Sequence, residues 1–155
     1  MRKEHEKAIA EAKRAIALNP NRAEAYNMLG LALLVSDRPV ESIGFCKKAI
    51  QLNPFPPSIY LVNLGNAYRA TGQYDKAIEA FKKGIKREPN NIFAYVSLTG
   101  TYSLMGREKE AHEAALEVLK IDPEFSLKKF AKVAPSKNQD KLKCYIEALR
   151  KAGLK

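Results

Sequence analysis

Residues 58–91 decide the fold, and they read S-I-Y-L-V-N-L-G-N-A-Y-R-A-T-G-Q-Y-D-K-A-I-E-A-F-K-K-G-I-K-R-E-P-N-N. From Ala77 to Ile85, apolar residues recur at steps of three and four positions, which is typical of an amphipathic α-helix. Gly72 precedes this helix at a place where a left-handed residue is often needed. Pro89 ends the helix, because proline lacks an N–H and disfavours helix in the residue before it. The stretch therefore predicts two helices joined by a short turn.

The same pattern recurs along the chain with a nearly constant period. Pro20, Pro54, Pro89 and Pro123 are separated by 34, 35 and 34 residues. Other landmarks keep this spacing: Leu29-Gly30 with Leu64-Gly65, Gly72 with Gly106, Ala77 with Ala111, and Tyr68 with Tyr102. Self-similarity at such a period indicates a repeat protein, in which each unit buries its apolar face against its neighbours.

These landmarks resemble those of the tetratricopeptide repeat (TPR) family. The resemblance implies an all-α fold, a TPR superhelical solenoid of antiparallel helix pairs with a C-terminal capping helix. It places a TPR domain at residues 1–125, with a half repeat at 3–22 and full repeats at 23–56, 58–91 and 92–125. Because the first helix of the earliest repeat is missing, we expect the chain to be a fragment of something longer.

Residues 126–155 differ in character and are the basic part of the chain. They hold nine Lys or Arg side chains and only two acidic ones, Asp140 and Glu147, which gives this segment a net charge of +7. The net charge of the whole chain is +10. A short helix is expected before Pro135, and a second from about Asn138 to Gly153, with Ser136 or Asn138 as its N-cap. We expect this segment to be a basic helical cap. It also resembles a tail that follows repeats in some bacterial proteins, including multidomain adenylate cyclases.

The sequence favours a non-catalytic protein without cofactor or metal. His5 and His112 are isolated from other ligand-type residues, and no phosphate-binding loop or nucleophile motif occurs. Cys46 and Cys144 are far apart, and Cys46 stands where the family has a buried Phe, so we expect an inert core thiol there. No stretch reaches the length of a membrane span. The cysteine usage favours a reducing, cytoplasmic setting.

In the TPR family, the first helix of each repeat lines a concave, ligand-binding groove. The resemblance assigns a mainly apolar set of residues to this peptide-binding groove: Asn27, Leu31, Leu34, Ile59, Val62, Asn63, Asn66, Arg69, Phe93 and Val96. An asparagine amide can both donate to and accept from a peptide backbone, so we expect these amides to contact the main chain of a protein or peptide ligand. Arg69 could add a fork for a carboxylate or phosphate.

Two other functions stay open at this point. The chain could be the regulatory C-terminal portion of a larger bacterial enzyme, such as an adenylate cyclase. It could also bind anions or nucleic acid through basic pairs on the second helices, at Lys13-Arg14, Lys47-Lys48 and Lys82-Lys83. Nucleic acid is the less favoured partner, because no aromatic residues are interleaved with these pairs. An exposed apolar groove also leaves homodimerisation open.

Overall fold

A computed structural model describes the backbone of residues 2–155 and the side chains of residues 4–155. This part of the chain is α-helical without any strand, which confirms the predicted all-α class. Its nine helices are α1 (Arg2–Leu18), α2 (Ala23–Val35), α3 (Pro39–Leu52), α4 (Ser58–Ala70), α5 (Tyr74–Arg87), α6 (Ile92–Leu104), α7 (Glu108–Ile121), α8 (Leu127–Val133) and α9 (Gln139–Lys151).

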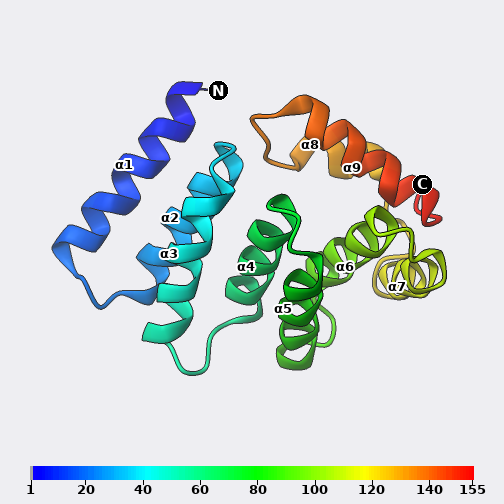
Figure 1. Cartoon of the computed structure of the whole chain (residues 1–155), viewed down its shortest axis with the longest axis horizontal. Helices are drawn as coiled ribbons and strands as arrows, with labels where there is room; N and C mark the ends of the chain where they lie inside the picture. The colour runs from blue at the N-terminus through cyan, green and yellow to red at the C-terminus, as the bar shows by residue number, and fades with distance from the viewer. Residues whose placement is uncertain (1) are drawn as a thin grey trace.

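The helices form antiparallel pairs that stack into an arc (Figure 1). Helix α2 pairs with α3, α4 with α5, and α6 with α7, while α1 packs on α2 without a partner of its own. Successive pairs meet through α3 and α4 and through α5 and α6. Helices α2, α4 and α6 also contact one another in sequence and line the concave side of the arc. This arrangement is the predicted solenoid of helix pairs.

Each pair is joined by the same tight turn. Asp37, Gly72 and Gly106 all have positive φ, at 62°, 76° and 71°. The residue after each one donates its backbone N–H to a carbonyl five residues earlier, as in Arg38 to Leu33 and Gln73 to Tyr68, both at 2.9 Å. Aspartate tolerates this left-handed conformation better than most residues, so Asp37 can replace the glycine of the other repeats.

Close crossing of the two helices in a pair requires a small residue at the contact. A Cβ atom added to Gly30 would lie 2.5 Å from the Cys46 sulfur, and one added to Gly65 would lie 2.7 Å from Cδ1 of Phe81. Cys46 and Phe81 are completely buried at equivalent places of successive repeats. The two glycines therefore let α3 and α5 approach the backbones of α2 and α4.

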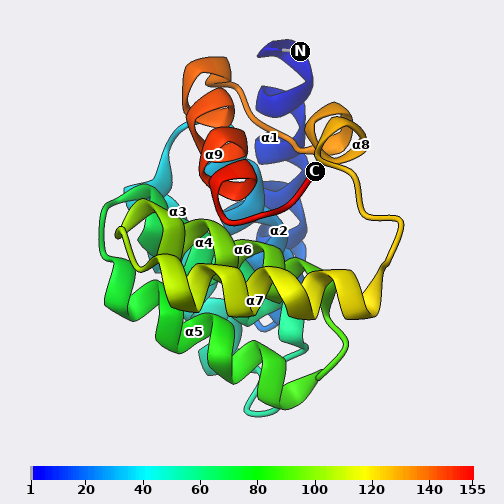
Figure 2. The same ribbon diagram turned by 90° about the vertical axis from the view of Figure 1, so that its right-hand side faces the viewer.

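Helices α8 and α9 close the C-terminal end of the core. Of the two candidate caps, Ser136 and Asn138, it is Asn138 that caps α9, by accepting a hydrogen bond from the Lys141 backbone N–H at 3.0 Å. Ile146, Leu149 and Leu154 are buried in the same core cluster as Phe81 and Val118. Helix α9 packs on α6, on the side away from α5, and so lies on the concave face (Figure 2). The sequence predicts a cap in this segment, but it does not indicate that the cap lies on the concave face.

We expect Gly65→Ala to lower the free energy of unfolding by about 1–3 kcal/mol, because the new methyl group must displace the buried Phe81 ring. The matched control is Gly44→Ala in α3, where an added Cβ meets no atom within 4 Å. That change should stabilise the protein by up to about 1 kcal/mol through helix propensity alone. Urea unfolding followed by circular dichroism measures both, and equal effects of the two variants would contradict the packing argument.

The two cysteines should differ strongly in reactivity toward a thiol reagent at pH 8. Burial raises the pKa of the Cys46 thiol to about 11, so it stays protonated, whereas Cys144 is exposed. We expect Cys144 to react at least roughly a hundredfold faster, because the thiolate is the reactive form. In guanidinium chloride both thiols should react at similar rates. Rapid modification of two thiols per folded chain would contradict this assignment.

Candidate ligand-binding groove

The concave face holds a cavity of about 370 Å³ that is bounded on its other side by α8, α9 and the loop between them. Nine of the ten groove residues predicted from the sequence line it: Leu31, Leu34, Ile59, Val62, Asn63, Asn66, Arg69, Phe93 and Val96. The opposite wall consists of residues that the sequence did not point to: Phe130, Val133, Ala134, Pro135, Ser136, Asn138, Lys141, Leu142 and Tyr145. Helices from separate parts of the chain therefore build one cavity.

Apolar side chains on the concave face remain partly open to solvent. Leu31 is 38% exposed, Ile59 is 41% exposed and Phe93 is 57% exposed. These residues lie on α2, α4 and α6, one on each concave helix. When apolar groups of a partner cover such a surface, the burial of apolar area stabilises the complex.

Two of the predicted groove asparagines bind each other. The Asn63 Nδ2 atom donates to Oδ1 of Asn27 at 3.1 Å, and both side chains are buried. Asn27 does not line the cavity, so its amide serves the contact between α2 and α4. The sequence could not show this pairing, because it depends on how closely successive first helices approach.

Asn66 and Arg69 differ from Asn27 and Asn63 in the hydrogen bonding of their side chains. In the part of the chain that the structure describes, Asn66 Oδ1 and Arg69 Nη1 are buried without a hydrogen-bond partner. The Arg69 guanidinium lies over the ring of Tyr145 from α9, with its central carbon 3.9 Å from the ring centre. An acceptor and a donor one turn apart on α4 thus border an apolar cavity.

Tyr145 makes the most specific contact between α9 and the repeats. Its hydroxyl donates to the Val96 backbone carbonyl at 3.1 Å. A Cβ atom added to Gly100 would lie 2.7 Å from the Tyr145 Cζ atom, so the ring rests directly on the α6 backbone. Phe130 of α8 packs near the same ring, with centres 6.5 Å apart.

A second contact joins the start of α9 to the turn between α2 and α3. The Lys141 ammonium donates to Asp37 at 2.7 Å, and the Asn138 amide donates to the same carboxylate at 3.3 Å. The Lys137 backbone N–H donates to the Val35 carbonyl at 3.0 Å. The hydrogen bond from Lys141 is the main reason that the pKa of the Asp37 carboxyl lies below its ordinary value.

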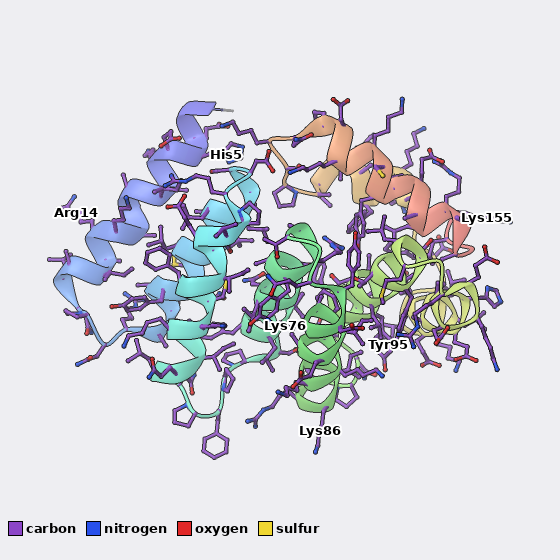
Figure 3. All side chains as sticks on the ribbon, in the orientation of Figure 1. His5, Arg14, Lys76, Lys86, Tyr95 and Lys155 are labelled. Atoms are coloured by element: carbon purple, nitrogen blue, oxygen red, sulfur yellow. The ribbon has the colours of Figure 1, made fainter. Side chains whose placement is uncertain are left out.

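The basic pairs lie away from this groove. All six side chains of Lys13-Arg14, Lys47-Lys48 and Lys82-Lys83 are exposed on α1, α3 and α5. Figure 3 shows Arg14 and Lys86 pointing outward, away from α8 and α9. Lys83 forms an ion pair with Glu79, one turn away on the same helix, at 2.6 Å. These cations therefore form a solvated outer face, separate from the cavity.

The described residues were also compared with the requirements of a metal site and of a membrane-spanning helix. They contain no group of three or more His, Cys, Asp or Glu side chains that could hold a metal ion. None of their helices is long and apolar enough to cross a membrane.

If the bond between Asn27 and Asn63 is structural, Asn63→Ala should lower the free energy of unfolding by about 1–3 kcal/mol, because it leaves a buried amide unpaired. Asn27→Ala should do the same. The double variant should be less destabilised than the sum of the two, by about 0.5 kcal/mol or more. Urea unfolding of the four proteins measures this coupling. Strictly additive effects would show that the two amides contribute independently.

Comparison with known proteins agrees with this architecture. Tetratricopeptide repeat models match residues 3–57 and residues 58–91, which together make up more than half of the chain. Small glutamine-rich tetratricopeptide repeat-containing protein 2 of Mycosarcoma maydis is 37% identical over 84 residues, or 54% of this chain. The chain spans only 23% of the length of that relative.

Solved structures share the fold over almost the full chain. The crystal structure of MamA superposes with a TM-score of 0.72 at 23% identity, covering 97% of this chain and 88% of that one. The structure of YrrB, described as a TPR protein with an unusual peptide-binding site, superposes with a TM-score of 0.65 at 20% identity. That match covers 97% of this chain and 77% of YrrB. With repeat models matching most of the stacked helix pairs, and with the same stack in solved repeat structures, this chain belongs to the tetratricopeptide repeat family.

Proposed function

We propose that this chain is a non-catalytic protein-interaction module whose concave groove binds a peptide or an extended or helical protein segment. The observation that carries the proposal is the partly exposed apolar surface of Leu31, Ile59 and Phe93 beside the unpaired polar atoms of Asn66 and Arg69. Ligand sites typically combine a mainly apolar lining with a few polar groups that fix orientation.

The two unpaired atoms are complementary to a peptide group. Asn66 Oδ1 can accept from a backbone N–H, and Arg69 Nη1 can donate to a carbonyl or carboxylate. A ligand that satisfies both atoms would remove the free-energy penalty of two buried unpaired groups. The peptide-binding site described for YrrB, a protein with the same fold, gives further support.

The size of the cavity limits what it can hold in the observed conformation. A volume of about 370 Å³ lies at the lower end of the range of small-molecule sites, so it would accept a few side chains and not a folded domain. A linear segment that inserts one or two apolar side chains fits this space best. The rest of such a segment would lie along the open part of α2, α4 and α6.

A double variant, Ile59→Ala with Phe93→Ala, tests the proposal. Peptides selected from a phage-displayed random library on the full chain should bind this variant at least about tenfold more weakly, because it removes exposed apolar area from the groove. Fluorescence anisotropy of the labelled peptides measures the Kd. Both side chains are partly exposed, so circular dichroism should show an unchanged fold.

The matched control is Val40→Ala with Phe55→Ala, which removes similar side chains that are 75% and 78% exposed outside the cavity. The control should leave the Kd unchanged. Equal affinity for all three proteins would contradict binding in the groove. A Kd that ignores both double variants and rises steeply with salt would move the site to the basic outer face.

A further inference from the structure

A second pocket, of about 360 Å³, lies outside the concave groove, where the end of α5 meets the connection between α3 and α4. Two apolar residues and three cations line it: Pro56, Leu61, Lys83, Lys86 and Arg87. We propose that this pocket binds an acidic segment of a partner protein, in which one aliphatic side chain is flanked by carboxylates. The pocket shares no lining residue with the groove, so the site stands apart from the proposed groove function.

The connection between α3 and α4 supplies part of an apolar floor. It has five residues, 53–57, whereas the connections between α1 and α2 and between α5 and α6 have four each. The Phe55 backbone N–H donates to Oδ1 of Asn53 at 3.1 Å, which holds the turn in place. Pro56 is buried, and beside it Leu61 of α4 is only 8% exposed. The pocket therefore has a fixed aliphatic floor that does not depend on mobile side chains.

Three cations of α5 lie beside this floor on one face of the helix. Lys86 and Arg87 follow Lys83 by three and four positions, which is the spacing of neighbours on a helix surface. Lys83 pairs with Glu79, whereas neither Lys86 nor Arg87 has an ion-pair partner among the residues that the structure describes. The Arg87 guanidinium lies 5.3 Å from the ring centre of Phe55. Figure 3 shows Lys86 pointing outward at the end of α5 away from α8 and α9.

Neighbouring repeats do not reproduce this cluster of cations. The equivalent places hold Lys48, Gln51 and Leu52 in α3, and Glu117, Lys120 and Ile121 in α7. In α7, Lys120 and Glu117 pair with each other at 2.5 Å. The three cations and the longer connection thus occur together in one repeat. A solvated helix face does not require this coincidence, whereas a binding pocket does.

Charge and shape together define the partner. Carboxylates of an acidic segment would face Lys86 and Arg87, while its aliphatic side chain would cover Pro56 and Leu61. A pocket of this size accepts one or two side chains and not a folded domain. Nucleic acid fits less well, because none of the lining residues is aromatic and the floor offers no face for base stacking.

A labelled synthetic peptide, G-S-E-D-L-E-D-S-G, is the probe, and fluorescence anisotropy with the full chain measures its Kd. The variant Lys86→Gln with Arg87→Gln should bind it at least about fivefold more weakly, because two charges no longer face the carboxylates. Both side chains are exposed, so circular dichroism should show an unchanged fold. The matched control, Lys13→Gln with Arg14→Gln, removes the same charge from exposed places on α1 and should change the Kd by less than about twofold.

Two further measurements separate the apolar and the ionic parts of the interaction. A second probe with serine in place of leucine should bind the wild type at least about threefold more weakly, because it cannot cover the aliphatic floor. Raising sodium chloride from about 0.05 M to about 0.5 M should weaken binding of the first probe at least about tenfold. Equal affinity of the two probes would overturn the proposed aliphatic contact, and binding that ignores salt would overturn the ionic one.

The remaining outcomes distinguish this site from the groove and from simple attraction by net charge. The groove variant, Ile59→Ala with Phe93→Ala, should bind the acidic probe as tightly as the wild type does. Loss of binding in that variant would place the acidic segment in the groove, which overturns the second site and leaves the proposed function standing. Equal losses in the Lys86→Gln, Arg87→Gln variant and in its control on α1 would show that net charge alone attracts the probe.

No probe binding at protein concentrations up to about 1 mM would also overturn the proposal. Labelled single-stranded oligothymidylate tests the other class of acidic partner. If it binds more tightly than the peptide and loses that affinity in the Lys86→Gln, Arg87→Gln variant, the partner is nucleic acid and the acidic segment is ruled out.

Discussion

The close crossing of two helices within each repeat is the interaction on which the rest of the structure depends. Gly30 and Gly65 allow the second helix to approach the first, and Cys46 and Phe81 fill the contact completely. At the same contact of the next repeat, 34 positions later, the sizes of the two residues are reversed. Thr99 stands in the place of Gly65, and Ala115 stands in the place of Phe81. Both are buried. This exchange of a large and a small residue across the contact keeps the crossing close, as core packing requires.

The stack of such pairs produces a concave side that the repeats alone cannot fill. Helices α2, α4 and α6, the first helices of successive repeats, contact one another in sequence. At the contact between α2 and α4, the hydrogen bond between Asn27 and Asn63 satisfies two polar groups. Apolar side chains on this face, such as Leu31, Ile59 and Phe93, stay partly exposed. Helices α8 and α9 and the loop between them bound the cavity on its other side, and the unpaired atoms of Asn66 and Arg69 remain beside it. A groove of this kind follows from the geometry of the solenoid and not from any one motif.

The sequence was informative wherever the cause of a structure is local. Prolines at near-constant spacing predicted the helix ends, and the left-handed turns at Gly72 and Gly106 were predicted from residue type and register. The Asn138 cap and the pair of Glu79 with Lys83 are also local, since their partners lie within four residues. The cavity residues on α2, α4 and α6 came from the family resemblance, and the opposite wall was missed. Contacts such as Asp37 to Lys141 span 104 residues and leave no periodic signal.

The sequence by itself determined that this protein is a repeat solenoid, because helix periodicity, turn residues and repeat length are set within each 34-residue unit. It also determined which helix faces are apolar. Only the tertiary structure decided where α9 lies, which amides pair with each other, and which apolar residues stay exposed. The physical reason is that these features depend on the curvature of the whole stack. That curvature brings α6 and the α2–α3 turn within reach of one C-terminal helix.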